Sequence, residues 1–325
     1  MRKITLLLLL FGCVLLYFLI QKVGIDSLWS SAKVIGLNSL YLIPLSLIWI
    51  IPNTYGFAFA MDKNEKKISF RKLMVTRLVG ESVNYLTPSG YLGGEALKAA
   101  LLSKSMGVSG ASSSVFIAKT SQTLALLIFI VVGLLFAKLM LVLPHEVKIA
   151  ATGSLILLSL GVLAMVFVSR GKYLSPIVRW INQRFSKFGF VSKLNDFIHK
   201  IDHYFSNYFK NNKKRFTYSF LMHFMGWALG TIEVMFIIFI LGYSISLMNA
   251  FILSSIATLF MVGGFFIPGS LGAFEIGHYL AASMVGLPPE VGVSVSLARR
   301  FREIVWLGMG LVLFALFYKK FVQKK

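Results

Sequence analysis

Long apolar runs, separated by short polar stretches, make up most of this chain. They lie at residues 4–20, 41–60, 115–137, 150–169, 218–242, 248–267 and 303–318. Since about 20 apolar residues cross a bilayer as a helix, the runs predict an all-α, polytopic integral membrane protein. The composition agrees, because 57% of the 325 residues are hydrophobic, against about 45–50% in soluble domains. We expect residues 1–325 to form a single transmembrane domain.

Basic residues gather in three polar stretches and predict the orientation of the chain. They lie at 61–77, at 170–217 and in the C-terminal YKKFVQKK, and the net charge is +21. Because cytoplasmic loops are rich in Lys and Arg, we expect these stretches and both termini on the cytoplasmic side of the cell membrane. The aromatic residues among the cations of 170–217 predict an amphipathic segment on anionic headgroups. No nucleic-acid-binding module accompanies the charge, so nucleic acid is not an expected partner.

Two stretches rich in proline and glycine interrupt the apolar pattern. With 61–77 and 170–217 both cytoplasmic, residues 70–110 must enter and leave from the cytoplasm, and 248–287 from outside. Their midpoints read LTPSGYLGGE and IPGSLGAFE, which predict turns between helical legs. The expected turn residues are Pro88, Gly90, Gly93, Gly94, Pro268, Gly269 and Gly272. The expected architecture is therefore about six full spans plus two re-entrant helical hairpins.

A shift of 180 residues superimposes the two halves of the chain. Pro88 falls on Pro268, Glu95 on Glu275, and Lys119 on Arg299. The span at 41–60 likewise falls on 221–240, so the repeat halves cover about 41–137 and 221–318. Their opposite orientations make this an inverted repeat. Inverted repeats with broken helices are typical of transporters, whose binding site lies between the repeats.

Charged residues after each hairpin tip are the candidate binding residues. Glu95 and Glu275 fall in or near the first turn of the second leg, where backbone N–H groups are free. Each glutamate either caps its own helix or also faces a polar central cavity, and the sequence leaves both interpretations open. Lys98 follows Glu95 by three residues and joins the candidate set.

Four further cations lie beyond the hairpins: Lys119, Arg299, Arg300 and Arg302. A charge within the bilayer usually faces a partner or water. We expect this set to bind an anionic phosphate, lysine as a point charge and arginine as a fork. The alternative is that Arg300 and Arg302 extend to the surface from the outer end of their span. His199 and His203 lack a third ligand cluster, so no metal site is expected.

Two segments resemble a known family. They are TPSGYLGGEALKAALLSKSMGVSGASSSVFIAKTSQTLAL and FFIPGSLGAFEIGHYLAASMVGLPPEVGVSVSLARRFREIVW. They are similar to the two signature regions of the lysylphosphatidylglycerol synthase transmembrane family, also called flippase-like or UPF0104, over about residues 40–318. The best-known members fuse this region to an aminoacyl transferase. Because the sequence ends at Lys325 directly after its last span, the resemblance implies the lipid-translocating part without the synthase chemistry. Members often carry arginine where this chain has Lys98 and Lys119.

The expected function is that of a lipid flippase or scramblase, which moves a lipid with an anionic phosphate headgroup between leaflets. Membrane lipids are the expected partners, and a separate lipid-modifying enzyme is a candidate partner. No cofactor and no catalytic residue is expected. Two alternatives remain open on the sequence. One is a membrane glycosyl- or phospho-transferase that acts on a polyprenyl-phosphate lipid, and the other is a secondary transporter of a small soluble anion.

Overall fold

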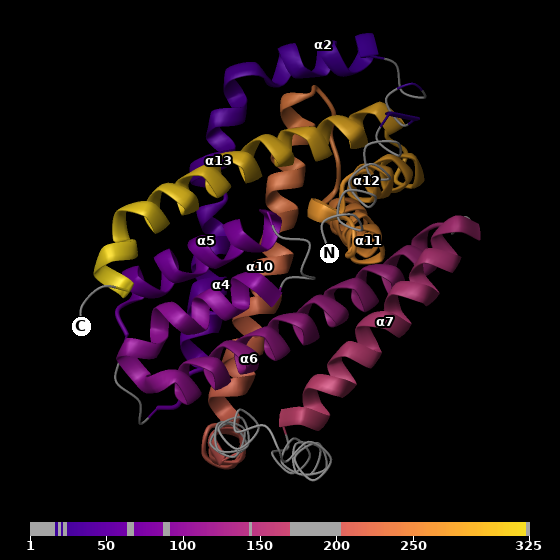
Figure 1. Cartoon of the computed structure of the whole chain (residues 1–325). Helices are drawn as coiled ribbons and strands as arrows, with labels where there is room; N and C mark the ends of the chain where they lie inside the picture. Colours follow the sequence, from indigo (N-terminus) through magenta and orange to yellow (C-terminus); the bar gives the residue numbers. More distant parts are fainter. Residues whose placement is uncertain are drawn as a thin grey trace, which may run out of the picture.

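The computed structural model describes residues 25–63, 68–86, 92–142, 145–169 and 203–322, with the isolated residues 17, 18 and 21. Every regular element within these ranges is a helix (Figure 1). The first group of helices is α2 (Ile25–Ile35), η1 (Gly36–Tyr41), α3 (Leu42–Leu45), α4 (Leu47–Phe59), α5 (Phe70–Leu86), α6 (Leu92–Met140) and α7 (His145–Ser169). The second is α10 (Lys213–Ile240), α11 (Leu247–Gly263), η2 (Pro268–Ser270), α12 (Ala273–Met284) and α13 (Pro289–Val322). The all-α prediction is confirmed.

Four stretches in the described part of the chain are long and apolar enough to cross a membrane: Leu28–Phe59, Gly93–Met140, Val147–Ala164 and Lys213–Ile240. Large apolar side chains on α7 are exposed, among them Ile156, Leu160 and Leu163. Such a surface is favourable in a bilayer, so the chain is a multi-pass membrane protein. The expected run 4–20 lies almost wholly outside the described residues, and 303–318 lies within α13. The count of six spans stays a prediction.

The first hairpin is formed by α5 and the start of α6, which pack against each other. Gly93 and Gly94 were expected in the turn, but α6 already begins at Leu92. Glycine at position 94 serves the close packing of α6 on α5, because a Cβ there would lie 2.0 Å from the carbonyl oxygen of Gly80 on α5. Pro88 and Gly90 lie outside the described residues. A break at Gly107 (φ 74°, ψ 162°) ends this leg and divides α6.

The second hairpin consists of α11 and α12, joined by a turn that contains η2. Pro268, Gly269 and Gly272 lie in this turn, as the sequence predicts. Gly269 has φ 61° and Gly272 has φ 80°, a region that glycine enters without steric penalty. Gly286, with φ 81°, separates α12 from α13. The order of hairpin, glycine break and long helix therefore occurs twice along the chain.

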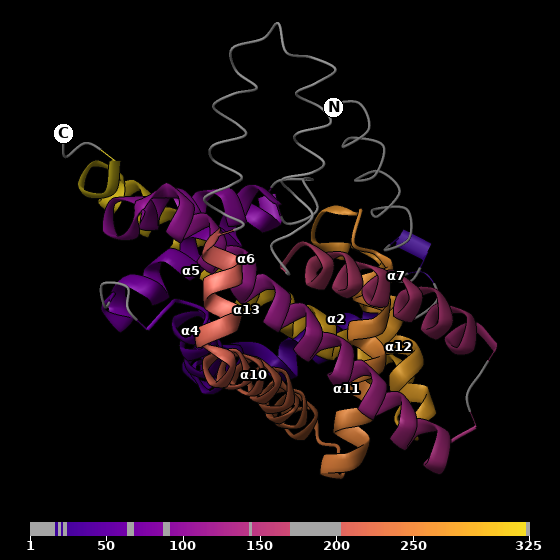
Figure 2. The same ribbon diagram turned by 90° about the horizontal axis from the view of Figure 1, so that it is seen from below.

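Helices of the two halves pack against each other at the centre of the molecule. Helix α13 packs along α5, and α10 packs against both α4 and α6 (Figure 1). Seen from below, α6 and α7 run side by side (Figure 2), and α7 also contacts α11. Elements from both halves thus surround one central space.

The segment 170–217 is described only from residue 203 onward, so the predicted amphipathic surface lies mostly outside the described residues. Residues 203–211 are helical and pack against the end of α4. Phe205 and Tyr208 are buried, and the Tyr208 hydroxyl donates to the carbonyl of Phe59 at 2.8 Å. This end of the segment is therefore part of the helical core.

Candidate functional site: a charged cavity between the two halves

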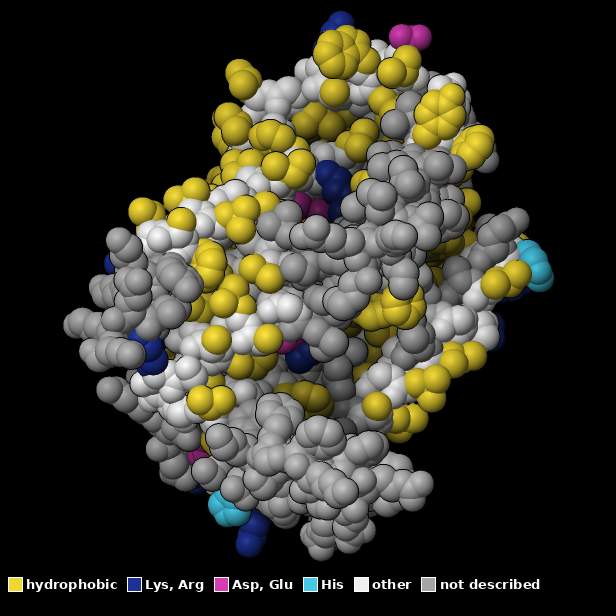
Figure 3. All heavy atoms as spheres, in the orientation of Figure 1, with side chains coloured by type: hydrophobic (Ala, Val, Ile, Leu, Met, Phe, Trp, Pro, Cys, Tyr) yellow, Lys and Arg dark blue, Asp and Glu magenta, His cyan; other side chains and the backbone are white. Residues whose placement is uncertain are grey.

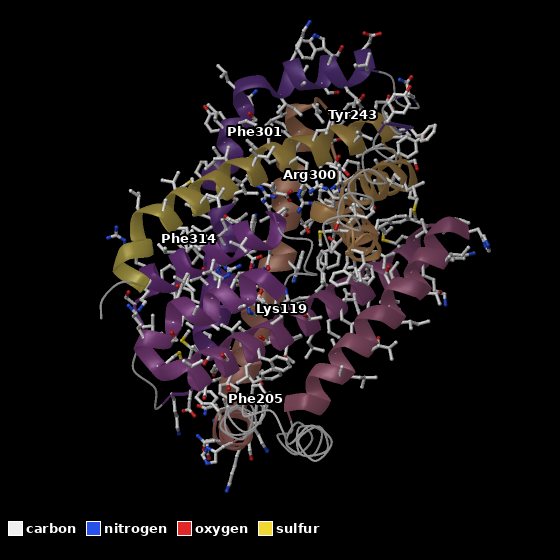
Figure 4. All side chains as sticks on the ribbon, in the orientation of Figure 1. Lys119, Phe205, Tyr243, Arg300, Phe301 and Phe314 are labelled. Atoms are coloured by element: carbon white, nitrogen blue, oxygen red, sulfur yellow. The ribbon has the colours of Figure 1, made fainter. Side chains whose placement is uncertain are left out.

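A cavity of about 520 Å³ lies between the two halves and is lined by α4, α5, α6, α7, α10, α11, α12 and α13. Its charged lining residues are Arg77, Glu81, Lys119, Arg299, Arg302 and Glu303. Figure 4 shows Lys119 on α6 and Arg300 on α13 in the middle of the molecule. The space-filling view shows small groups of cationic and acidic atoms among hydrophobic and neutral ones (Figure 3). The structure thus brings Lys119 and Arg299, equivalent at the 180-residue offset, to one cavity.

Lys98 is the centre of the ion network in the first half. Its ammonium lies 2.7 Å from Glu81 and 3.0 Å from Glu95, and the residue is 4% exposed. Glu95 also lies 3.8 Å from the ammonium of Lys119. Lys98 and Glu95 are not cavity-lining residues, whereas Glu81 and Lys119 are. Glu95 therefore positions the Lys119 side chain in the cavity wall from outside the lining.

The start of α6 is capped by a residue of α5. Asn84 Oδ1 accepts from the N–H of Gly94 at 2.7 Å, and Asn84 Nδ2 donates to Glu95 at 3.3 Å. One amide side chain therefore satisfies a free N–H of the helix and orients a carboxylate. Glu95 also binds Lys98 and Lys119.

Glu275 has two roles in the second half. One of its oxygens accepts from the N–H of Gly272 at 2.7 Å and caps α12, as the capping interpretation predicts. The other binds the Arg300 guanidinium at 2.8 Å. Arg300 also lies 3.2 Å from Glu303, a cavity-lining residue. Glu275 itself is 1% exposed and is not part of the lining.

Glu233 of α10 holds the other two arginines. It is 0% exposed, and its Oε2 lies 3.1 Å from Arg302 Nη1 and 3.5 Å from Arg299 Nε. Both arginines line the cavity. Because Arg302 is 3% exposed and α13 begins at Pro289, the alternative that Arg302 extends to the surface is wrong. Arg299 is also packed over the ring of Phe274, with 5.2 Å to the centroid, an arrangement that favours a cation.

Sequence reasoning missed three charged residues of this region. Arg77 was expected in a cytoplasmic loop, but α5 begins at Phe70 and carries Arg77 into the cavity wall. There it donates to the Ile50 carbonyl and the Thr54 hydroxyl, both at 3.1 Å. Glu81 and Glu233 were not singled out at all. For Glu233 the available signal was a lone carboxylate within the apolar part of a long helix, which rarely occurs without a partner.

The charges of this region nearly balance. The charged lining residues, and the described residues joined to them through ion pairs, comprise six cations and five carboxylates. The cations are Arg77, Lys98, Lys119, Arg299, Arg300 and Arg302, and the carboxylates are Glu81, Glu95, Glu233, Glu275 and Glu303. One positive formal charge is left over. Uncompensated charge is costly away from water, so the region suits a single anionic group. No group of three or more potential metal ligands occurs among the described residues.

Comparison with known proteins agrees with the expected family. Residues 5–311 match the family described as Lysylphosphatidylglycerol synthase TM region. The chain is also 24% identical, over 246 residues, to a UPF0104 membrane protein of the archaeon Pyrococcus horikoshii; the match covers 72% of each chain. No solved structure matches significantly. The resemblance inferred from the two signature segments is therefore confirmed.

Proposed function

The chain belongs to the lysylphosphatidylglycerol synthase transmembrane family, and on this premise we propose that it moves a lipid with an anionic, phosphate-containing headgroup between membrane leaflets. The observation that carries the proposal is the shared cavity, which is lined both by Lys119 of one half and by Arg299 of the other. Guanidinium and ammonium groups bind phosphate oxygens strongly in a low-dielectric site. The single excess positive charge fits a phosphodiester, which carries one negative charge.

We also propose that the two hairpins enter the membrane from opposite faces of the cell membrane, with both termini cytoplasmic. The support is the asymmetry of loop charge and the twofold occurrence of hairpin, glycine break and long helix. At the 180-residue offset, α5 falls on 250–266, which overlaps α11, and the second part of α6 falls on α13. In this arrangement the cavity lies near the midplane, where each half can open it toward one leaflet.

The lipid proposal is tested in proteoliposomes with fluorescent phosphatidylglycerol and a reductant that reaches only the outer leaflet. We expect labelled phosphatidylglycerol to change leaflet faster than in protein-free vesicles, and faster than labelled phosphatidylcholine, whose headgroup has no net charge. Uptake of radiolabelled glycerol 3-phosphate is measured in parallel. Uptake of this soluble anion without lipid movement would favour the small-anion transporter and contradict the proposal.

The orientation proposal is tested with single cysteines at Lys63 and Tyr243, which the 180-residue offset relates. Both are exposed residues beside the ends of α4 and α10. In a Cys13→Ser background, a thiol reagent that cannot cross the membrane should label Lys63→Cys from the cytoplasmic face and Tyr243→Cys from the outer face. Labelling of both positions from one face would contradict the inverted arrangement.

A further inference from the structure

The cavity changes character along one face of α6. Lys119, Gln122 and Thr123 line its polar part, and Leu126 and Phe129 line the part that follows. Lys119 and Phe129 are ten residues apart, or about 15 Å along the helix axis. This distance is about half the hydrocarbon thickness of a bilayer. A ligand that follows this face would meet cations at one end and hydrocarbon at the other.

Four helices form the apolar end. Phe129 of α6, Leu158 of α7 and Val262 of α11 belong to one hydrophobic cluster, against which Trp227 of α10 packs. All four residues also line the cavity. The headgroup site of the proposed function uses none of these side chains. An apolar compartment continuous with a cationic one matches an amphiphilic ligand, which has an anionic group at one end and hydrocarbon at the other.

Two glycines, one on α7 and one on α10, border open space in the cavity. Gly161 and Gly230 both line the cavity, and a Cβ built on either would meet no atom within 4 Å. Gly153 on α7 is also open to a Cβ, but it is exposed and does not line the cavity. Residue 153 therefore offers a matched control for residue 161 on the same helix.

We propose that the apolar end of the cavity, between α6, α7, α10 and α11, holds a hydrocarbon chain of the lipid and that the chain passes between Gly161 and Gly230. The inference rests on the proposed function for the identity of the headgroup. It assigns the substrate class as an intact lipid whose chain stays inside the protein while the phosphate is bound. A larger side chain at residue 161 or 230 would fill the passage and exclude the chain.

The test is photo-crosslinking with phosphatidylglycerol that carries a diazirine in its acyl chain, followed by mapping of the labelled residues by mass spectrometry. Phe129 is 1% exposed, whereas Leu163 on α7 is 64% exposed. Label at Phe129 therefore reports chain in the cavity, and label at Leu163 reports lipid on the outside. We expect both in the wild type. Gly161→Leu should lower Phe129 labelling at least fivefold and leave Leu163 labelling unchanged, and Gly153→Leu should change neither.

Gly230→Leu repeats the test from the opposite wall, so the result does not depend on the folding of one variant. No Phe129 labelling in the wild type would overturn the inference, as would unchanged labelling in folded Gly161→Leu and Gly230→Leu proteins. The measurement does not need transport. A protein that labels at Phe129 but moves no lipid would refute the proposed function and leave the hydrocarbon site standing.

Discussion

The two hairpin halves place their charges at matching positions but connect them differently. In the first half, Asn84 caps α6, and Glu95 binds Lys98 and Lys119. In the second half, Glu275 caps α12 and binds Arg300, while the equivalent of Lys119, Arg299, lies by Glu233 on another helix. The comparison teaches that two segments related by the 180-residue offset can carry charges at matching positions and still give them different partners. It also predicts that the loss of a single carboxylate lowers the stability of the protein by different amounts in the two networks.

The largest effect should come from Glu233→Gln. This carboxylate is fully buried and pairs with the buried Arg302 and the partly buried Arg299, so its loss removes a counterion from both. We expect the free energy of unfolding to fall by about 3–5 kcal/mol, measured by reversible unfolding in mixed micelles. A second change, Arg302→Gln, should recover part of the loss. A loss below about 1 kcal/mol would show that water or other groups compensate the charges of the two arginines when Glu233 is replaced.

A smaller effect is expected from Gly94→Ala in the first hairpin. The new Cβ would lie 2.0 Å from the Gly80 carbonyl oxygen, so the two legs would have to separate. Overpacking of this kind costs about 1–3 kcal/mol. The control is Gly230→Ala, where the Cβ meets nothing within 4 Å and where alanine should stabilise the helix by about 0.5–1 kcal/mol. Opposite signs in the same unfolding assay support the description of the hairpin, and equal signs would contradict it.

Glu95→Gln should have the smallest effect on stability. Lys98 would keep its 2.7 Å contact with Glu81, and the Asn84 cap on α6 does not need the Glu95 carboxylate. We expect a loss of about 1 kcal/mol under the conditions used for Glu233→Gln. If Glu95→Gln proved as destabilising as Glu233→Gln, the proposed difference between the halves would be wrong.

The sequence predicted the helical class from periodicity. It also singled out the residues of the second hairpin turn from proline and glycine positions, and Lys119 and Arg299, which line one cavity, from a shared offset. It placed Gly93 and Gly94 wrongly, since α6 already begins at Leu92 and Gly94 packs closely against Gly80 of α5, a contact between helices. Arg77 was assigned to a loop because charge alone does not show where a helix begins. Glu233 binds arginines 66 and 69 residues away in sequence, and only the tertiary structure brings them together.

The most direct test of the central claim, that cations of both halves bind one anionic headgroup, is phosphatidylglycerol movement in proteoliposomes that contain Lys119→Gln or Arg299→Gln. The controls are Lys138→Gln and Arg71→Gln, which remove exposed charges outside the cavity lining. We predict that each cavity variant loses about tenfold in rate, the equivalent of about 1.4 kcal/mol, while the controls keep theirs. Arg299→Lys should fall in between, because it keeps the charge and loses the fork. Wild-type transport by a stably folded Arg299→Gln protein would contradict the claim.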